Sequence, residues 1–128
     1  VDTGGGMGMR AGLGKKGTKA VGKMKIDDGG SSGFCKKDDI RPNVMRRAGA
    51  IRACYDAQLQ THESLAGKPT IRWVINQEGK VDGASIASST LGNSAVEQCV
   101  LRVIRAMRFQ KPESGVCVVQ WPFVFNPG

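Results

Sequence analysis

Four cysteines are the residues of this sequence best suited to covalent chemistry or to metal binding. They are separated by 19, 45 and 18 positions and are Cys35, Cys54, Cys99 and Cys117. Structural zinc sites usually draw their ligands from close pairs, whereas this chain has no Cys-x-x-Cys pair and a single histidine. An even number of cysteines in a small domain instead predicts disulfides formed in an oxidising compartment. Free thiols in a buried core are the alternative.

Residues that could act in catalysis are few and poorly placed. His62 stands in the polar run THES at 61–64, which superficially resembles a nucleophile, a base and an acid. Neighbours in one loop rarely reach the geometry that a nucleophile and its base require. Asp38 and Asp39 precede a stretch of apolar periodicity, and we interpret this pair as helix caps. We therefore expect no enzymatic activity, no cofactor and no bound metal.

Glycine dominates the first 33 residues, which hold 11 of the 18 glycines and no aromatic residue. The run GMG at 6–8 hints at a dinucleotide loop and residues 12–19 at a phosphate loop, but no strand precedes either one. A segment of this composition buries too little apolar surface to offset the entropy lost on ordering. We predict that residues 1–33 are a disordered linker rich in glycine and lysine, and that residues 34–128 form one domain.

The chain is basic, since 19 Lys and Arg residues against 11 Asp and Glu residues give a net charge of +8. Such an excess can mark binding to nucleic acid, anionic lipid or a cell-wall polymer. Here the basic residues are spread along the chain, which favours a solvated surface without specific binding of nucleic acid. Polyanion binding, to peptidoglycan or nucleic acid, is the alternative function. The lysines of residues 1–33 could also make weak contact with the cell wall.

Apolar periodicity predicts two amphipathic helices. The first is about 18 residues long, with Asp39 as its N-cap and Pro42 in its first turn. Its apolar stripe consists of Ile40, Val44, Ala48, Ile51, Tyr55 and Leu59, with Cys54 beside it. The second helix begins at Asn93 or Ser94, with Glu97 placed to complete a capping box. Its apolar face consists of Val96, Cys99, Val100, Val103, Ile104 and Met107.

Three segments have the pattern of β-strands. Residues 70–76 alternate between apolar and polar, and residues 81–90 follow a turn in which Gly79 can take positive φ. The run at 116–125 is rich in β-branched and aromatic residues, and Pro122 within it requires a free edge or a bulge. The order helix, strand, strand, helix, strand predicts an α+β fold, with two helices packed on one face of a three-stranded antiparallel sheet.

The same order of elements carries residues that resemble the TonB C-terminal domain superfamily, and within it the AgmX/PglI C-terminal group of gliding-motility proteins. The motifs that carry the resemblance are Cys54-Tyr55, Gly67-Lys68, INQEGKV at 75–81, Ser88-Ser89-Thr90-Leu91, Glu97-Gln98-Cys99-Val100, Arg108-Phe109 with Pro112, and Trp121-Pro122-Phe123-Val124-Phe125. Each motif alone is weak, and their order and spacing together are fairly specific. Residues 1–40 lie outside the match.

The resemblance implies a protein-binding module in the periplasm. An upstream segment would tether it to the inner membrane, and the start of the chain within linker sequence agrees with that expectation. In the family, proton flow at the inner membrane is coupled to partners at the outer membrane, and the gliding group belongs to a trans-envelope motility machine. The partners would be outer-membrane or periplasmic proteins of the same complex, with inner-membrane proton-channel proteins reached through the upstream segment.

This sequence departs from that group by adding Cys35 and Cys117. Four cysteines allow three pairings. Because Cys54 and Cys99 lie on or beside the apolar stripes of two helices that should share one sheet face, we predict a disulfide between them. Cys35 and Cys117 would then form the remaining pair.

The last strand is predicted to be the edge that binds a partner. An edge strand presents unpaired N–H and C=O groups, which an extended peptide can take up by strand addition. The expected contact residues are Val116, Val118, Val119, Gln120 and Trp121. The alternative is that this strand only completes the core and that its edge is covered. Trp121 and Phe123 lie on the same side of the strand as Cys117 and Val119, and we predict that they belong to the core, with partner contact as the alternative.

Overall fold

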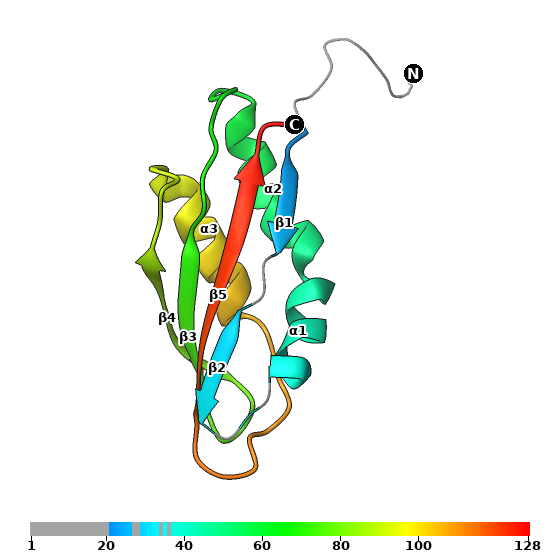
Figure 1. The fold of residues 1–128 in the computed structure, drawn as a ribbon, viewed down its shortest axis with the longest axis vertical. Helices are drawn as coiled ribbons and strands as arrows, with labels where there is room; N and C mark the ends of the chain where they lie inside the picture. Colours follow the sequence, from blue (N-terminus) through cyan, green and yellow to red (C-terminus); the bar gives the residue numbers. More distant parts are fainter. Residues whose placement is uncertain (1–20, 27–28, 34, 36) are drawn as a thin grey trace.

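Three helices and five strands follow one another in the part of the chain that the computed structural model describes, residues 21–26, 29–33, 35 and 37–128. In chain order they are β1 (Lys23–Ile26), β2 (Gly30–Gly33), α1 (Lys37–Arg46), α2 (Ala48–Leu59), β3 (Thr70–Ile75), β4 (Val81–Ser88), α3 (Ser94–Arg105) and β5 (Cys117–Asn126). The helices lie on one face of a single antiparallel sheet (Figure 1). The α+β class is as predicted, with one helix and two strands more than expected.

The extra helix arises because the predicted first helix is divided at Arg47. The Arg47 N–H donates to the carbonyl of Val44 at 3.0 Å, a three-residue spacing that closes α1 before α2 begins. The predicted roles of Asp39 and Pro42 are wrong, since α1 already begins at Lys37. Asp39 therefore lies in the first turn, where a carboxylate interacts favourably with the positive end of the helix dipole. Pro42 lies inside the helix.

The helices bury the predicted apolar stripes against the sheet. The buried residues of α1 and α2 are Ile40, Val44, Ile51, Cys54, Tyr55 and Leu59. The ring of Tyr55 stacks on Phe125 of β5, with 4.7 Å between centroids, and its hydroxyl donates to the carbonyl of Leu65. These contacts join the helix layer to the strand at the centre of the sheet.

Asn93 is the N-cap of α3, which is one of the two predicted alternatives. Its side chain accepts a hydrogen bond from the Val96 N–H at 3.0 Å. Glu97 does not complete a capping box with Ser94, because its carboxylate instead accepts from the Ser89 hydroxyl at 2.6 Å. Glu97 thus anchors the loop between β4 and α3.

The hairpin of β3 and β4 forms as predicted. Gly79 takes a φ of 83° in its turn, and the Asn76 N–H donates to the Lys80 carbonyl at 2.8 Å. Alternate residues of β3 and β5 are buried on the face towards the helices: Ile71, Trp73, Ile75, Cys117, Val119, Trp121, Phe123 and Phe125. Trp121 and Phe123 therefore belong to the core. The opposite sheet face carries exposed or half-buried side chains such as Arg72 and Val124.

The sheet has the order β1-β5-β3-β4, and β2 also pairs with β5. β1 and β2 lie along the side of β5 away from β3 (Figure 1). Both strands fall inside residues 1–33, so the prediction of a disordered linker is wrong for 21–26 and 29–33. Residues 1–20 lie outside the described part. The composition of the segment misleads because most of its pairing uses backbone groups, which any sequence can supply.

Candidate protein-binding edge of the sheet

β5 is paired on both of its sides, so the free edge predicted for it is not present. β3 lies on one side. On the other side, β1 pairs with residues 123–126 and β2 pairs with residues 117–120. We call β1 and β2 together the cover, and the side of β5 that faces them the covered edge. The prediction fails because the supposed linker supplies the strands that occupy this edge.

The backbone groups of β5 alternate between its two sides. The N–H groups of Phe123 and Phe125 donate to the carbonyls of Pro69 and Gly67, at 3.0 and 2.9 Å, on the side of β3. In an antiparallel strand, successive residues direct their hydrogen-bonding groups to opposite sides. The register between β3 and β5 is unbroken. Odd-numbered residues of β5 therefore face β3, and even-numbered residues face the cover.

This alternation divides the five predicted contact residues. Val118 and Gln120 direct their backbone groups to the covered edge, opposite Ser32 and Gly30 of β2. Val119 and Trp121 face β3 instead, and their side chains are fully buried. Val116 precedes β5 and is 44% exposed. The structure thus brings two of the five residues to one edge and places two others in the core.

Pro122 lies at the break between the two covering strands. As an even-numbered residue it faces the covered edge, where it has no N–H to donate. β1 ends opposite Phe123 and β2 begins opposite Gln120, so neither strand needs a donor from Pro122. Beside this break Gly29 rests on the indole of Trp121, where an added Cβ would lie 2.2 Å from Cδ2. The covered edge is therefore divided into two half-sites. The β1 half-site is residues 123–126, and the β2 half-site is residues 117–120.

The β1 half-site holds its strand by side-chain contacts as well as backbone pairing. The Gly22 N–H donates to Asp56 Oδ1 at 2.8 Å, and an added Cβ at Gly22 would lie 2.3 Å from Cε2 of Tyr55. Met24 and Ile26 are partly buried and pack against the core. Because Lys23, Met24, Lys25 and Ile26 alternate, this short pattern is the signal from which β1 could have been predicted.

The β2 half-site holds its strand in a different way. The sequence of β2 is GSSG, which offers no apolar side chain to the core. A disulfide joins Cys35, just beyond β2, to Cys117 at the start of β5, with 5.9 Å between their Cα atoms. Gly33 takes a φ of 103°, and an added Cβ there would lie 2.3 Å from the Val116 carbonyl oxygen. The Cys35–Cys117 disulfide and the turn at Gly33 therefore hold β2 against β5.

Both predicted disulfides are present. Cys54 of α2 is joined to Cys99 of α3, with 5.7 Å between Cα atoms, and together with the Cys35–Cys117 bond this leaves no free cysteine. Two disulfides in a small domain indicate an oxidising compartment outside the cytoplasm. Within the described residues, no helix is long and apolar enough to cross a membrane.

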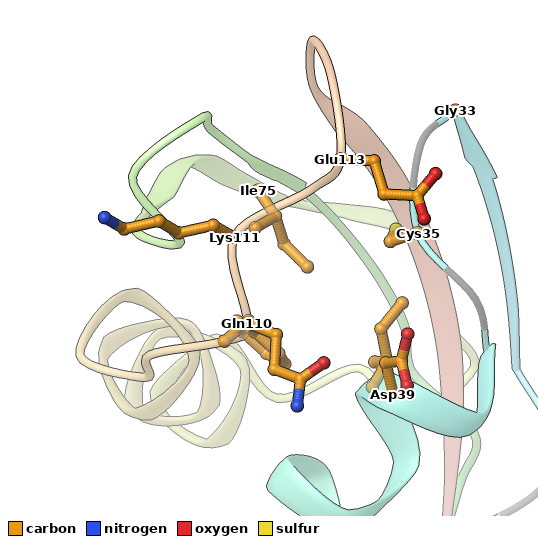
Figure 2. A pocket seen from close by; sticks show the side chains of 9 residues that line it. Gly33, Cys35, Asp39, Ile75, Gln110, Lys111 and Glu113 are labelled. Carbon is orange, nitrogen blue, oxygen red and sulfur yellow. The ribbon is translucent and has the colours of Figure 1, made fainter.

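A pocket of about 330 Å³ opens beside the Cys35–Cys117 disulfide, between the end of β2, the start of α1 and the loop after α3. Figure 2 shows the carboxylates of Asp39 and Glu113 at its rim, with Lys111 on the same loop as Glu113. Cys35 lines the pocket but is held in the disulfide, so it offers no nucleophile. No group of three or more His, Cys, Asp or Glu side chains among the described residues could hold a metal ion.

The polar run at 61–64 does not line this pocket, whereas Asp39 does. His62 is exposed after α2, with its Nδ1 at 2.9 Å from the Thr61 hydroxyl and 3.3 Å from the Gln58 carbonyl. Its neighbours Glu63 and Ser64 are also exposed. Comparisons with family models, curated proteins and solved structures give no match. The covered edge is thus the feature of the described structure that most closely fits a binding function.

Proposed function

We propose that this chain is the periplasmic protein-binding module of a TonB-like, trans-envelope energy-transducing protein, of the kind used in bacterial gliding-motility machines. It holds its partner by strand addition on the even-numbered side of β5. One observation supports this most strongly: that side already accepts two four-residue strands from outside the core. Backbone ladders of this kind accept extended segments of many sequences, and their side chains set the specificity.

The disulfides and the sequence motifs support the proposed place of this module in the cell. Two disulfides are compatible with the periplasm, and the motifs from Cys54-Tyr55 to the final run at 121–125 resemble those of TonB-like domains. An upstream segment would tether the module to the inner membrane and contact proton-channel proteins there. The partner at β5 would be an outer-membrane or periplasmic protein of the same complex.

Photo-crosslinking in living cells tests this function. A photo-reactive amino acid replaces Gln120 or Val124, even-numbered residues of β5, in the complete native protein. The matched control replaces Ser85 on β4, which pairs with Arg72 and lies on the same open sheet face. We expect capture of one envelope protein from the β5 positions and not from Ser85. No capture from β5 in motile cells, or equal capture from Ser85, would contradict the proposal.

Backbone substitution gives an independent check. Gln120→Pro removes one donor from the covered edge and should lower the yield of the crosslink from Val124 or impair motility. Gln120→Ala keeps the donor and changes an exposed side chain, so its effect should be mild. Amide spectra must first show that the proline variant is folded. A folded proline variant that binds as well as the parent would mean that the partner does not pair with residues 117–120 and uses the β1 half-site, a helix or the open sheet face.

A second candidate function, polyanion binding, is favoured by one basic groove. Arg46 and Arg47 at the end of α1 and Arg108 after α3 line a hollow of about 440 Å³. Guanidinium groups bind phosphate and carboxylate well. Binding of peptidoglycan fragments or nucleic acid that persists at physiological salt would support this function. Binding seen only at low salt would show a non-specific electrostatic contact.

A further inference from the structure

The two half-sites of the covered edge differ in how easily they can open. β2 is joined to β5 through the Cys35–Cys117 disulfide, so it can be displaced only over a very short distance. β1 is held by a four-residue ladder, by partly buried Met24 and Ile26, and by the Gly22 hydrogen bond to Asp56. These contacts are reversible. A competing strand can therefore replace β1 more easily than β2.

The break at Pro122 separates the displacement of β1 from that of β2. Since Pro122 gives no hydrogen bond to the covered edge, the ladder of β1 and the ladder of β2 do not continue into one another. Loss of β1 removes the pairing of residues 123–126 and leaves that of 117–120 in place. The half-site of β1 can thus open while β2 stays seated.

The seat of β1 also defines what can fill it. The position of Gly22 lies against Tyr55 and Leu59, where an added Cβ would approach carbon atoms of the two side chains to 2.3 and 2.8 Å. Only glycine can occupy this position without displacing the side chains of Tyr55 and Leu59. Two and four residues later, Met24 and Ile26 lie opposite Phe125 and Phe123 on the core side of the sheet. Lys23 and Lys25 alternate with them, on the opposite face.

We infer that β1 is a placeholder for the partner, which enters the β1 half-site as a segment with the pattern glycine, any residue, apolar, any residue, apolar. The segment runs antiparallel to β5, with its glycine against Tyr55 and its apolar side chains above Phe125 and Phe123. This inference rests on the proposed function, since it specifies the half-site and the partner chemistry of the strand addition.

A peptide copied from this chain provides the probe. The hexapeptide VGKMKI, the sequence of residues 21–26, is titrated into the isotope-labelled complete chain. Gly22→Val in that chain weakens its own β1 by a clash with Tyr55. We expect the variant to bind the peptide at least about tenfold more tightly than the parent, because its half-site is open for a larger fraction of the time. Amide shifts should change at Val124 and Asn126 and not at Val118.

Two controls keep this test specific. Gly30→Val adds the same side chain to β2, where a Cβ meets nothing within 4 Å, and should not raise affinity for the peptide. The peptide VVKMKI lacks the glycine and should bind neither chain. If Gly22→Val disturbs the fold, Ile26→Ser weakens β1 without a clash and takes its place. Equal binding of both peptides, or shifts at Val118 rather than Val124, would overturn the inference.

The outcomes also separate this inference from the proposed function. If crosslinks from Gln120 capture an envelope protein but VGKMKI never binds the opened chain, the module binds proteins and the choice of half-site is wrong. If VGKMKI binds as expected but no position on β5 captures a protein in cells, β1 is exchangeable and the proposed function fails.

Discussion

The two sides of β5 are held by different means. Towards β3, six residues pair in unbroken register, and the inward side chains of both strands are fully buried or nearly so. Towards the cover, two four-residue strands are separated at Pro122, and only Met24 and Ile26 of their side chains are apolar. β5 is therefore held by buried side chains and backbone pairing on one side, and mainly by backbone pairing on the other. Under the proposed function, a partner would compete for the second side without disrupting the first.

This difference should appear as a difference in local stability. Proteins open in parts, and segments with few buried apolar contacts open at a smaller free-energy cost than the core. β1 and β2 bury little apolar surface, whereas β3 and β5 carry Trp73, Trp121, Phe123 and Phe125. The disulfides add a second distinction. The Cys54–Cys99 bond joins two helices, whereas the Cys35–Cys117 bond joins the end of β2 to β5.

Removal of each disulfide should have the largest effect. The bonds close loops of 45 and 82 residues, and each should contribute about 4 kcal/mol to the free energy of unfolding in the chain-entropy model. Cys54→Ala/Cys99→Ala should lower global stability only. Cys35→Ala/Cys117→Val should also release β2, so that the Val118 and Gln120 amides exchange faster than the global loss explains. Urea denaturation and amide exchange measure the two effects.

The disulfide comparison has a clear contrary result. If the variant that lacks Cys35 and Cys117 loses stability but keeps slow exchange at Val118 and Gln120, the disulfide does not hold β2 in place. The β2 half-site would then be retained by its backbone ladder alone, and the contrast between the half-sites would disappear.

Proline at two adjacent positions should separate the two sides of β5. Val119→Pro removes a donor to β3 and a buried side chain, and should lower the free energy of unfolding by about 3 kcal/mol. Val118→Pro removes a donor only to β2 and should cost about 1 kcal/mol. Both variants carry the constraint of the proline ring. The difference between their losses in free energy of unfolding therefore reports which side of β5 each residue faces. Equal losses in urea denaturation would contradict the alternation.

A smaller effect should come from Tyr55, on which β1 is seated. Burial, and after it the charge of Asp56, raises the pKa of the Tyr55 hydroxyl above its ordinary value of 10.0. The folded chain keeps this proton where the unfolded chain loses it. The contribution of Tyr55 is therefore complete below pH 10.0 and is lost as the pH rises through the folded pKa.

Tyr55→Phe checks this pH dependence. At neutral pH it should cost about 1 kcal/mol, because the hydrogen bond to the Leu65 carbonyl is lost. Above pH 10.0 the stability of the parent should fall more steeply than that of the variant. Denaturation curves at both pH values measure the difference. The same alkaline slope in both proteins would show that Tyr55 ionises as freely in the folded chain as in the unfolded one.

Where burial follows the periodicity of the sequence, the fold could be predicted. The stripe from Ile40 to Leu59 and the alternation at 70–76 and 116–125 record which side chains face the core, and the structure buries those faces. Both disulfides follow from this placement, because Cys54 and Cys99 stand on helices that share a sheet face. A hydrophobic pattern is reliable when side chains provide the stabilising contacts.

Features that depend on backbone geometry could not be predicted in the same way. β2 has the sequence GSSG, and its pairing with β5 leaves no trace in hydrophobicity. The division at Arg47 depends on one three-residue hydrogen bond, and the apolar stripe continues across it. The predicted contact residues lie on β5 or just before it, all before Pro122, and Val119 and Trp121 among them face β3. The half-site that we infer for the partner, at residues 123–126, lies on the other side of Pro122.

Amide hydrogen exchange along β5 tests most directly whether the covered edge opens while the core stays folded. Exchange is followed at residues 117–126 of the complete chain under native conditions. We predict an alternation, with slow exchange at Val119, Phe123 and Phe125, which face β3, and faster exchange at Val124 and Asn126, which face β1. Equal protection of odd- and even-numbered amides, all exchanging only on global unfolding, would show that β1 is a permanent part of the core and would contradict the account.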